Sequence, residues 1–422
     1  MIRLRIAVAS VAALLLVALG VFGSPAAPAA PIAPAALIAP AAPTGATTTS
    51  VPQQFDPATV ERLDAAITDT MERTGIPGVS VGVWIPGRGT YEKSFGVSDT
   101  STGTPMKTDM HMRIGSVTKT FTVTGLLQLV DQRKVGLDDL IDKYVPGVPQ
   151  GGHISLRELA EMRSGLFNYT DDEKWEQSLR DDPQRSYTPQ ELLDYSFAHR
   201  LNFPPGSKWQ YSNTNTVLLG LVIEKVSGQP LGAYLEEHVY APLKLQQTSL
   251  PTNAALPEPY AHGYTDDTQP GAPTATATGD TVDATHWDPS WAWAAGAMVS
   301  TLDDLHTWVP ALVDGRLLKP ATQKQRLAFG PTGIPNVSYG LGVMRVNGWI
   351  GHNGELPGYE TLAVQLPGQQ ATLVILINSD DDYRGQSLST LMGRAVTSVV
   401  TPDNVFDIPS APQSPTTSPS AS

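Results

Sequence analysis

The pattern of hydrophobic positions in residues 56–400 changes several times between helical and strand spacing. Residues 57–73 carry apolar side chains at helical spacing, and residues 79–97 then alternate in the manner of two strands around a Pro-Gly-Arg-Gly turn. Towards the other end of this region the alternation returns, and residues 384–400 follow it with the spacing of a closing helix. The alternating segments, which predict strands, are residues 339–346, 349–352, 360–366 and 371–378.

Between these two β-rich ends the pattern is mostly helical. An N-terminal hairpin that joins a C-terminal antiparallel sheet, with a helical region inserted between them, predicts an α+β fold with two lobes. We expect a functional site in the cleft between the sheet edge and the helical lobe, because concave sites form where such layers meet. The segments with helical spacing are residues 118–133, 156–162, 189–199, 214–226, 230–239 and 302–313.

The two ends of the chain differ in composition from residues 56–400, which we expect to form one domain. Residues 1–26 begin with two arginines and a long apolar run and end in Ser-Pro-Ala, as a secretory signal peptide does. The run is also just long enough to span a bilayer, so an uncleaved anchor is the alternative. Residues 27–55 are rich in proline and alanine and predict an extended spacer, whereas the Ser/Pro-rich residues 401–422 predict a disordered tail. We therefore expect an exported protein of the cell envelope, with no stable membrane insertion once the signal is cleaved.

Charge and cysteine content exclude several classes of function. The chain carries 28 Lys and Arg against 41 Asp and Glu, a formal net charge of −13. Such a surface repels nucleic acid and anionic lipid headgroups, so we expect neither as a partner. The absence of cysteine excludes disulfides, thiolate metal sites and a cysteine nucleophile. The histidines are scattered along the sequence, and we expect no metal and no cofactor.

The first of three short motifs is Ser116-Val117-Thr118-Lys119, at the start of an apolar helical pattern. Residues three apart lie on one helix face, with about 5–6 Å between their Cβ atoms, so the Ser116 hydroxyl and the Lys119 ammonium can meet. The positive potential of a helix N-terminus favours an alkoxide at Ser116 and disfavours the charged form of Lys119, which can then act as a base. Chance matches to this pattern are frequent, and an ordinary N-cap serine is the alternative.

The second motif is Tyr211-Ser212-Asn213, which immediately precedes the helical pattern of residues 214–226. A loop tyrosine in this position can reach across a cleft, and its phenol can carry a proton to a leaving group. Asn213 can orient both a substrate amide and the lysine. The alternative is that Tyr211 packs against the preceding prolines while Ser212 or Asn213 caps the helix.

The third motif is His352-Asn353-Gly354, at the end of a predicted strand. Glycine beside a reactive centre permits close approach of the backbone, and a sheet edge lets an extended substrate pair with it. The next backbone N–H, that of Glu355, can form an oxyanion hole together with the N–H of Ser116. The alternative is a structural histidine in a turn.

The order and context of the three motifs make their combination specific. Ser-x-x-Lys is the nucleophile motif of serine β-lactamases and penicillin-binding proteins. Followed by Tyr-x-Asn and Lys/His-x-Gly, it resembles the branch of that superfamily that contains class C β-lactamases and D-alanyl-D-alanine carboxypeptidases. The resemblance extends over roughly residues 57–395. The matching segments outside the motifs are residues 114–121, 154–157, 163–166, 204–206 and 295–301.

The resemblance implies both a fold and a mechanism. The fold is β-lactamase/DD-peptidase-like, with one antiparallel sheet made from N- and C-terminal strands, flanking helices and a mostly helical lobe inserted between them. In the implied mechanism Ser116 is acylated and Lys119 activates it. Tyr211 acts as general base and later as general acid towards the leaving amine.

The resemblance also implies the residues that surround the substrate. The backbone N–H groups of Ser116 and Glu355 form the oxyanion hole, and no metal takes part. The residues implied to bind substrate are Asn213, His352, Asn353, Gly354 and Glu355.

The sequence departs from the family pattern beside the third motif. Carboxypeptidases of this type carry hydroxyl side chains there, which help to bind the substrate carboxylate, whereas this chain has Asn353 and Glu355. A desolvated Glu355 carboxylate would repel an anionic substrate by roughly a few kcal/mol, and a solvent-facing one by little. Arg326 and Arg345 are the candidate cations for a substrate carboxylate.

The resemblance implies an exported serine hydrolase that works through an acyl-enzyme. We expect a D-alanyl-D-alanine carboxypeptidase that acts on cell-wall peptides. A β-lactamase, an esterase and a D-amino-acid amidase are the alternatives with the same chemistry, so a small peptide, a β-lactam or an ester is the expected partner. The alternative from another class is an inactive penicillin-binding sensor or scaffold, against which the intact polar motif positions argue. The sequence carries no signal of oligomeric state.

Overall fold

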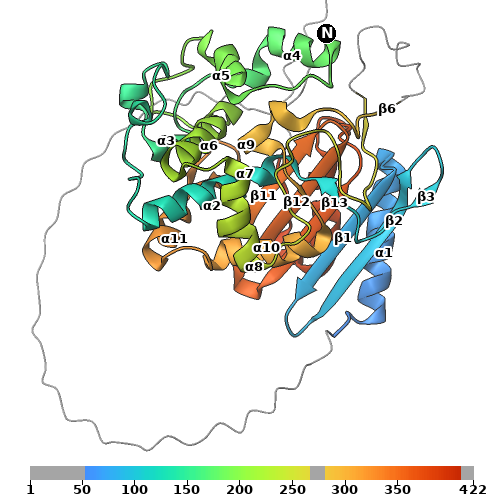
Figure 1. The fold of residues 1–422 in the computed structure, drawn as a ribbon. Helices are drawn as coiled ribbons and strands as arrows, with labels where there is room; N and C mark the ends of the chain where they lie inside the picture. The colour runs from blue at the N-terminus through green and yellow to red at the C-terminus, as the bar shows by residue number, and fades with distance from the viewer. Residues whose placement is uncertain (1–52, 267–280, 410–422) are drawn as a thin grey trace, which may run out of the picture.

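The centre of the molecule is an antiparallel sheet in which the two ends of the domain meet. The computed structural model describes residues 53–266 and 281–409. Nine strands form this sheet in the order β3-β2-β1-β13-β12-β11-β10-β9-β8 (Figure 1). The N-terminal hairpin joins it through the pairing of β1 with β13, as the sequence predicted. The strands are β1 (Gly78–Ile85), β2 (Gly89–Asp99), β3 (Thr104–Pro105), β8 (Gly330–Pro331), β9 (Val337–Tyr339), β10 (Met344–Val346), β11 (Trp349–Leu356), β12 (Tyr359–Leu366) and β13 (Ala371–Ile377).

The side chains of β13 show why helices cover both faces of the sheet. Leu373 and Ile375 are buried in one hydrophobic cluster together with side chains of α12 (Leu388–Val400). Val374 points to the opposite face and is buried with side chains of α10 (Leu302–Asp314). A strand that is apolar on both faces is typical of a sheet that lies between two helical layers. The predicted α+β fold is confirmed.

The outer layer is formed by α12 and by α1 (Pro57–Thr74), which lie against each other. Helix α1 begins at the N-cap Asp56, whose carboxylate accepts a hydrogen bond from the Thr59 N–H at 3.0 Å. It ends at Gly75, which has a left-handed backbone conformation. The first and last helices of the domain are therefore packed side by side, although more than 300 residues separate them.

The helical lobe packs against the inner face of the sheet (Figure 1). Two separate two-stranded sheets are found in the same part of the chain. Its helices are α2 (Thr118–Asp131), α3 (Leu156–Ala160), α4 (Glu173–Asp181), α5 (Pro189–Phe197), α6 (Asn213–Ser227), α7 (Leu231–Leu235), α8 (Ala241–Leu243), α9 (Trp293–Gly296) and α11 (Pro320–Arg326). The short strands are β4 (Met112–Arg113) paired with β7 (Val299–Ser300), and β5 (Tyr264–Thr265) paired with β6 (Val282–Asp283).

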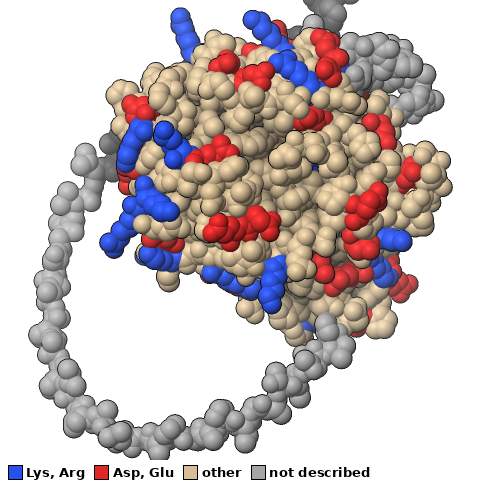
Figure 2. All heavy atoms as spheres, viewed as in Figure 1, with Lys and Arg blue, Asp and Glu red and all other residues tan. Residues whose placement is uncertain are grey.

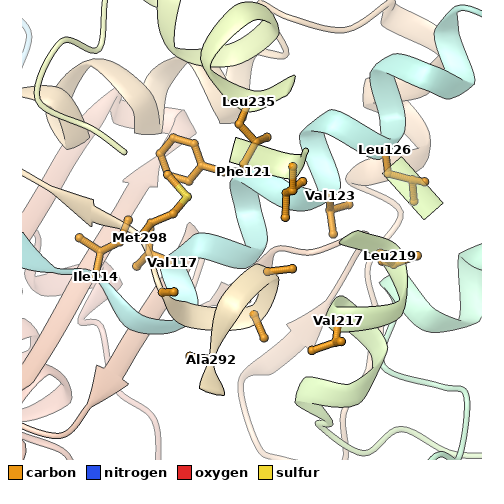
Figure 3. Close-up of a cluster of buried hydrophobic side chains, with 14 of the residues drawn as sticks. Ile114, Val117, Phe121, Val123, Leu126, Val217, Leu219, Leu235, Ala292 and Met298 are labelled. Carbon is orange, nitrogen blue, oxygen red and sulfur yellow. The ribbon is translucent and has the colours of Figure 1, made fainter. Parts of the chain in front are cut away.

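Helix α2 runs through the middle of this lobe and is buried on almost every side. Figure 3 shows Phe121 and Leu126 of α2 among apolar side chains from the neighbouring helices. Phe121 stacks on Trp308 with 3.9 Å between ring centroids. Its buried threonines form hydrogen bonds inside the protein, for example from Thr122 Oγ1 to the Ala294 carbonyl at 2.8 Å. A helix that is buried all round is fixed in position by its packing, and α2 carries the first motif.

Two expected elements differ from the observed ones. Residues 339–346 were expected to form one strand, but the structure has β9 and β10 with a turn between them. Gly342 lies in that turn with φ 66°, and a Cβ atom there would lie 2.6 Å from Val123 Cβ, so the chain bends where only glycine fits. The expected helix over residues 230–239 is α7 followed by a π-helical turn over Glu236–Tyr240. Helices α4, α8, α9 and α11 were not predicted.

The folded domain extends slightly beyond both boundaries predicted from the sequence. Phe55, at the end of the expected spacer, is buried and donates its N–H to the Thr90 carbonyl. Phe406, in the expected tail, is 0% exposed. The domain boundary predicted at residue 400 is therefore too early. The proposed signal peptide, residues 27–52 of the spacer and residues 410–422 of the tail lie outside the described residues.

The surface carries charges of both signs. Figure 2 shows acidic side chains scattered over the visible face, while basic ones are most frequent over the helical lobe. In the part of the chain that the structure describes, no helix is both long enough and apolar enough to cross a membrane.

Candidate active site

The candidate nucleophile lies in a tight turn between β4 and α2. Residues 115–117 form one turn of 3₁₀-helix, and Ser116 is partly exposed in its middle. Ile114 and Val117 on either side are buried near Met298, which anchors the turn in the core (Figure 3). The hydroxyl is thus presented to solvent by a segment that cannot move freely.

Lys119 contacts the Ser116 hydroxyl from the first turn of α2. Its Nζ lies 2.9 Å from Ser116 Oγ, 2.7 Å from Asn213 Oδ1 and 2.7 Å from the Ala295 carbonyl oxygen. The side chain is 0% exposed, and this burial lowers the pKa of Lys119 well below its usual value. The expected Ser–Lys contact is present, and the lysine is in an environment that favours the neutral amine.

Tyr211 approaches the same hydroxyl from the other side. Its phenolic O–H donates a hydrogen bond to Ser116 Oγ at 2.6 Å, and Lys119 Nζ lies 4.8 Å from its ring centroid. Burial raises the pKa of Tyr211, the hydrogen bond with Ser116 opposes this rise, and the negative charge of Glu355 adds to it. The resting phenol is therefore protonated at neutral pH.

Asn213 is held in place by residues that the sequence did not single out. It is the first residue of α6, and its backbone N–H donates to Asn168 Oδ1 at 2.9 Å. Its side-chain Nδ2 donates to Thr170 Oγ1 at 3.3 Å, which leaves Oδ1 directed at Lys119. Asn168 and Thr170 follow a segment that resembles the family, but neither carries a motif of its own.

Ala295 is a second residue that the sequence did not assign. Its backbone carbonyl contacts Lys119, so the residue type at position 295 does not reveal this role in the sequence. The preceding Trp293 has φ 30°, a conformation that a bulky side chain rarely adopts. Such strain persists where the surrounding structure enforces it, as often happens at functional sites.

His352 lies at the site, but both of its ring nitrogens contact other groups of the protein. It is 1% exposed, its Nε2 lies 3.0 Å from Tyr339 Oη and its Nδ1 lies 2.6 Å from the Asn353 carbonyl oxygen. A carbonyl can only accept, so Nδ1 carries the proton and Nε2 accepts from Tyr339. Burial lowers the pKa of His352 to about 3, with Lys119 contributing, so the ring is neutral. The histidine forms a wall of the site beside Tyr211, with 6.2 Å between the ring centroids.

The backbone of β11 packs directly against the nucleophile turn. A Cβ atom on Gly354 would lie 2.0 Å from the Ile114 carbonyl oxygen and 2.9 Å from Ser116 N. A Cβ atom on Gly115, whose φ is 49°, would lie 2.4 Å from Glu355 N. Glycine is needed at both positions because the two main chains would otherwise collide.

This contact brings the two expected oxyanion-hole groups to the same place. Leu356 and Tyr359 close a two-residue hairpin, so Glu355 and Glu360 form the next pair, which does not exchange hydrogen bonds. The Glu355 N–H therefore points away from β12, towards the edge of β11. The strand on that side, β10, pairs with residues 349–351, and among the described residues this pairing does not extend to Glu355.

The three motifs thus converge around one hydroxyl. Asn353 and Glu355 lie on the same strand, where they alternate with His352 and Gly354 between the two faces of the sheet. Asn353 is half-buried on β11, whereas the Glu355 side chain is exposed. The candidate carboxylate-binding arginines are held elsewhere. Arg326 is buried and donates to Thr124 Oγ1 at 2.6 Å, and Arg345 stacks on Phe329. Within residues 53–266 and 281–409, no three His, Asp or Glu side chains are grouped so that they could hold a metal ion.

Comparison with known proteins agrees with this geometry. The family model described as Beta-lactamase matches residues 63–396. The chain belongs to the β-lactamase family. This confirms the serine β-lactamase and penicillin-binding protein superfamily that the motifs predicted, while the class C and carboxypeptidase branch within it stays a prediction.

Solved structures similar to this β-lactamase-family chain include a D-stereospecific amidohydrolase and a D-amino acid amidase. A D-stereospecific amidohydrolase from Streptomyces sp. is 32% identical with a TM-score of 0.69, over 82% of this chain and 98% of that one. The D-amino acid amidase from Ochrobactrum anthropi SV3 in complex with D-phenylalanine is 30% identical with a TM-score of 0.73, over 81% of this chain and 98% of that one.

The curated relatives are longer proteins. Penicillin-binding protein 4* of Bacillus subtilis (strain 168) is 27% identical over 309 residues, which are 69% of this chain and 66% of that protein. The chain spans about two thirds of the length of the curated relatives that it matches.

Proposed function

We propose that the chain is a serine hydrolase that forms an acyl-enzyme on Ser116. The observation that carries this proposal is the pair of contacts to one hydroxyl: Lys119 Nζ at 2.9 Å and Tyr211 Oη at 2.6 Å from Ser116 Oγ. A nucleophile within hydrogen-bond distance of both a base and an acid is the arrangement that covalent catalysis of acyl transfer requires.

The contacts of Lys119 support its role as the first proton acceptor. Asn213 Oδ1 and the Ala295 carbonyl can only accept hydrogen bonds, and a neutral amine has two N–H groups to give them. Its lone pair then faces Ser116 Oγ. The sequence assigned the general-base role to Tyr211, but a protonated phenol cannot take a proton from Ser116. The geometry favours Lys119 as base and Tyr211 as acid in acylation.

The proposed reaction follows from these protonation states. Ser116 Oγ attacks the substrate carbonyl carbon and its proton passes to Lys119, while the N–H groups of Ser116 and Glu355 hold the oxyanion. The C–N bond then breaks, and the leaving nitrogen takes the phenolic proton of Tyr211. The proton held by Lys119 returns to Tyr211 through the shared hydrogen-bond network. Water subsequently attacks the ester, giving its proton to the same network, and releases the acid and free Ser116.

We favour amides of D-amino acids as the substrate class. Two solved proteins that are at least 30% identical to this chain and match over 98% of their own length are named a D-stereospecific amidohydrolase and a D-amino acid amidase. D-Alanyl-D-alanine cell-wall peptides, the substrate expected from the sequence, also present a D-residue to the nucleophile. They are the second candidate, supported by the similarity to a penicillin-binding protein. β-Lactams and simple esters would enter by the same chemistry.

The test is covalent labelling followed by turnover. The protein is incubated with a fluorescent penicillin and with an activated D-aminoacyl ester, and its mass is measured. An adduct on wild type that is absent from Ser116→Ala is the expected result. Rates are then compared for a D-amino acid amide, a D-Ala-D-Ala peptide and a short-chain ester. If wild type forms no adduct with either reagent and turns over none of the substrates, the chain is not an acyl-enzyme hydrolase, and the sensor or scaffold alternative gains support.

The proposal includes export to the cell envelope. It depends on the basic start and apolar run of residues 1–26, a segment outside the described residues. N-terminal sequencing of the mature protein from the culture and from membranes would distinguish a cleaved signal from a retained anchor. A cytoplasmic protein with an intact N-terminus would contradict export.

A further inference from the structure

We propose that Asn168 and Thr170 are positioning residues of the proposed reaction, which act through Asn213 and keep its amide oxygen on Lys119. This inference rests on the proposed acyl-enzyme function and adds to it the contacts that keep the base available to Ser116. Asn168 and Thr170 lie outside the three motifs, in a loop between α3 and α4.

The amide group of Asn213 can take two orientations, which differ by the exchange of its oxygen and its nitrogen. In the observed one the oxygen lies 2.7 Å from Lys119 Nζ and accepts one of its N–H groups, so the lone pair of the neutral amine is left for Ser116. In the other orientation an N–H of Asn213 would donate to that lone pair. Proton transfer from Ser116 therefore depends on which end of the amide faces Lys119.

Asn168 fixes the backbone of Asn213, because it caps α6 from a distant loop. Ser212 is the N-cap residue by position, but its side chain forms no cap hydrogen bond. The N–H of Asn213 instead donates to Asn168 Oδ1 at 2.9 Å, and the two residues are 45 positions apart. The first N–H groups of a helix have no partner within it, so this bond satisfies a donor that the helix itself cannot.

The amide of Asn168 is itself held in one orientation. A backbone N–H can only donate, so the atom that faces the Asn213 nitrogen is the Asn168 oxygen. The Asn168 nitrogen then donates to Thr170 Oγ1 at 2.6 Å and to Asp171 Oδ1 at 3.0 Å. Asn168 and Thr170 are both buried, so their hydrogen bonds have little competition from water.

Thr170 extends this arrangement to the side chain of Asn213. Its Oγ1 lies 3.3 Å from Asn213 Nδ2 and offers it an acceptor, so the oxygen of the amide is directed at Lys119. A charged Lys119 would hold the same orientation unaided, since an ammonium and an amide N–H can only donate. A neutral Lys119 can accept, so the Thr170 hydroxyl is needed in the form of the lysine that acts as base.

The loop that carries both residues is joined to the start of α6 by further hydrogen bonds. Thr214 Oγ1 donates to the Phe167 carbonyl at 2.7 Å and accepts from the Tyr169 N–H at 3.2 Å. Ser164 Oγ donates to Asn215 Oδ1 at 2.5 Å. Because these bonds do not involve the Thr170 side chain, we expect the loop to stay in place when that side chain is exchanged.

The first experiment removes the Thr170 hydroxyl and keeps the shape of the side chain. Thr170→Val should lower the plateau rate of single-turnover acylation of Ser116 by roughly tenfold, as loss of a buried hydrogen bond does. Thr170→Ser keeps the hydroxyl and should stay within about threefold of wild type. The matched control is Thr216→Val, because Thr216 of α6 is buried and its Oγ1 has no hydrogen-bond partner among the described residues. It should acylate at the wild-type rate.

The pH profile separates a positioning role from a purely structural one. When the Asn213 oxygen is lost, the Lys119 ammonium loses an acceptor, so the acid limb of acylation should lie about one pH unit lower in Thr170→Val. A loosened fold would lower the plateau without moving this limb. Tyr211 and His352 also face Lys119, but burial raises the pKa of Tyr211 and lowers that of His352 to about 3. Neither changes its charge near neutral pH.

A double-mutant cycle tests whether Thr170 acts through Asn213. In an Asn213→Ala background, Thr170→Val should cause no further fall in the acylation rate, because the residue through which it acts is gone. A full effect of Thr170→Val in that background would overturn the inference.

Asp171 is the titratable group that contacts Asn168, and burial raises its pKa while the hydrogen bond from Asn168 opposes the rise. Asp171→Asn keeps an acceptor oxygen for Asn168 and should keep the acid limb of wild type. An acid limb that is lost in this variant would assign the pH dependence to Asp171 and overturn the role of the Lys119 contact.

The outcomes separate this inference from the proposed function. If Ser116 of wild type is labelled and Thr170→Val acylates as fast as Thr216→Val, or more slowly with an unchanged acid limb, the positioning role is overturned while the acyl-enzyme stands. If Ser116 of wild type is never labelled, the proposed function fails and this inference with it.

Discussion

At the scale of single residues, the site is defined by a lysine whose surroundings favour the uncharged form. Lys119 is fully buried, and its nitrogen touches a hydroxyl, an amide oxygen and a backbone carbonyl. Burial disfavours an ammonium, and two of the three contacts are satisfied by a neutral amine. The sequence could place Ser116 and Lys119 on one helix face, because that follows from helical geometry. It could not provide the desolvation, which comes from α6 and α9.

The first prediction concerns the charge of this lysine. Arginine at position 119 remains protonated and cannot accept the Ser116 proton, so Lys119→Arg should lower kcat/KM by roughly a hundredfold or more. In wild type the neutral fraction of Lys119 grows with pH, so acylation should speed up as pH rises through its lowered pKa. Single-turnover labelling of Ser116 across pH measures both effects.

Lys225→Arg, at an exposed position of α6, is the control for the same exchange and should have the activity of wild type. Acylation by Lys119→Arg within about threefold of wild type would remove Lys119 from proton transfer.

At the scale of elements, the contact between β11 and the nucleophile turn determines whether the oxyanion hole exists. A glycine at position 354 is explained from the sequence alone, because close approach of a backbone is expected there. The fold decides which backbone comes close to Gly354, because residues 114–116 lie against residues 354–355. The segments are more than 200 residues apart, and no local pattern joins them.

The second prediction follows from the closeness of this contact. The Cβ atom in Gly354→Ala would lie 2.0 Å from the Ile114 carbonyl oxygen, so one of the two main chains must shift. We expect a loss of about 1–3 kcal/mol in the free energy of unfolding and a fall of roughly tenfold to a hundredfold in kcat/KM.

Gly368→Ala is the control for this prediction, because a Cβ atom there has nothing within 4 Å. Its unfolding free energy should stay within about 0.5 kcal/mol of wild type. Urea denaturation and ester hydrolysis on both variants make the comparison. Equal behaviour of Gly354→Ala and Gly368→Ala would show that the backbones are not in close contact.

At the scale of the whole molecule, the two ends of the domain are joined in one sheet and one helical layer. The pairing of β1 with β13 and the packing of α1 on α12 hold the N- and C-terminal segments together. Glu360 links the sheet to this outer layer, because its carboxylate receives the first N–H groups of α12. A buried carboxylate in this place ties the stability of the closed domain to pH.

The third prediction concerns that dependence. Burial raises the pKa of Glu360 to about 7, above the ordinary value of 4.5. Between these two values the folded state binds more protons than the unfolded state, so stability falls as pH rises through the window. We expect wild type to lose on the order of 2 kcal/mol from pH 5 to pH 7 relative to Glu360→Gln.

Urea denaturation at pH 5, 6 and 7 measures this difference, and Glu72→Gln serves as an exposed control that should follow wild type. Parallel curves for wild type and Glu360→Gln would mean that Glu360 has an ordinary pKa in the folded protein.

The sequence by itself predicted most of the elements and the candidate catalytic residues. Period-2 and period-3.6 patterns placed the hairpin, the C-terminal strands and most helices, because those periods follow from the geometry of a single segment. The three motifs identified Ser116, Lys119 and Tyr211 because the required side chains occur at fixed local spacing.

The tertiary structure decided the contacts and charge states that arise only where segments far apart in the sequence lie together. It buries Lys119 and places its Nζ against the Ala295 carbonyl oxygen. It also buries His352 as a neutral ring that is hydrogen-bonded to Tyr339. The fold also placed the Glu355 backbone nitrogen against the nucleophile turn and left Arg326 bound to Thr124. Charge states and close approaches are set by neighbours in space, which a linear pattern does not contain.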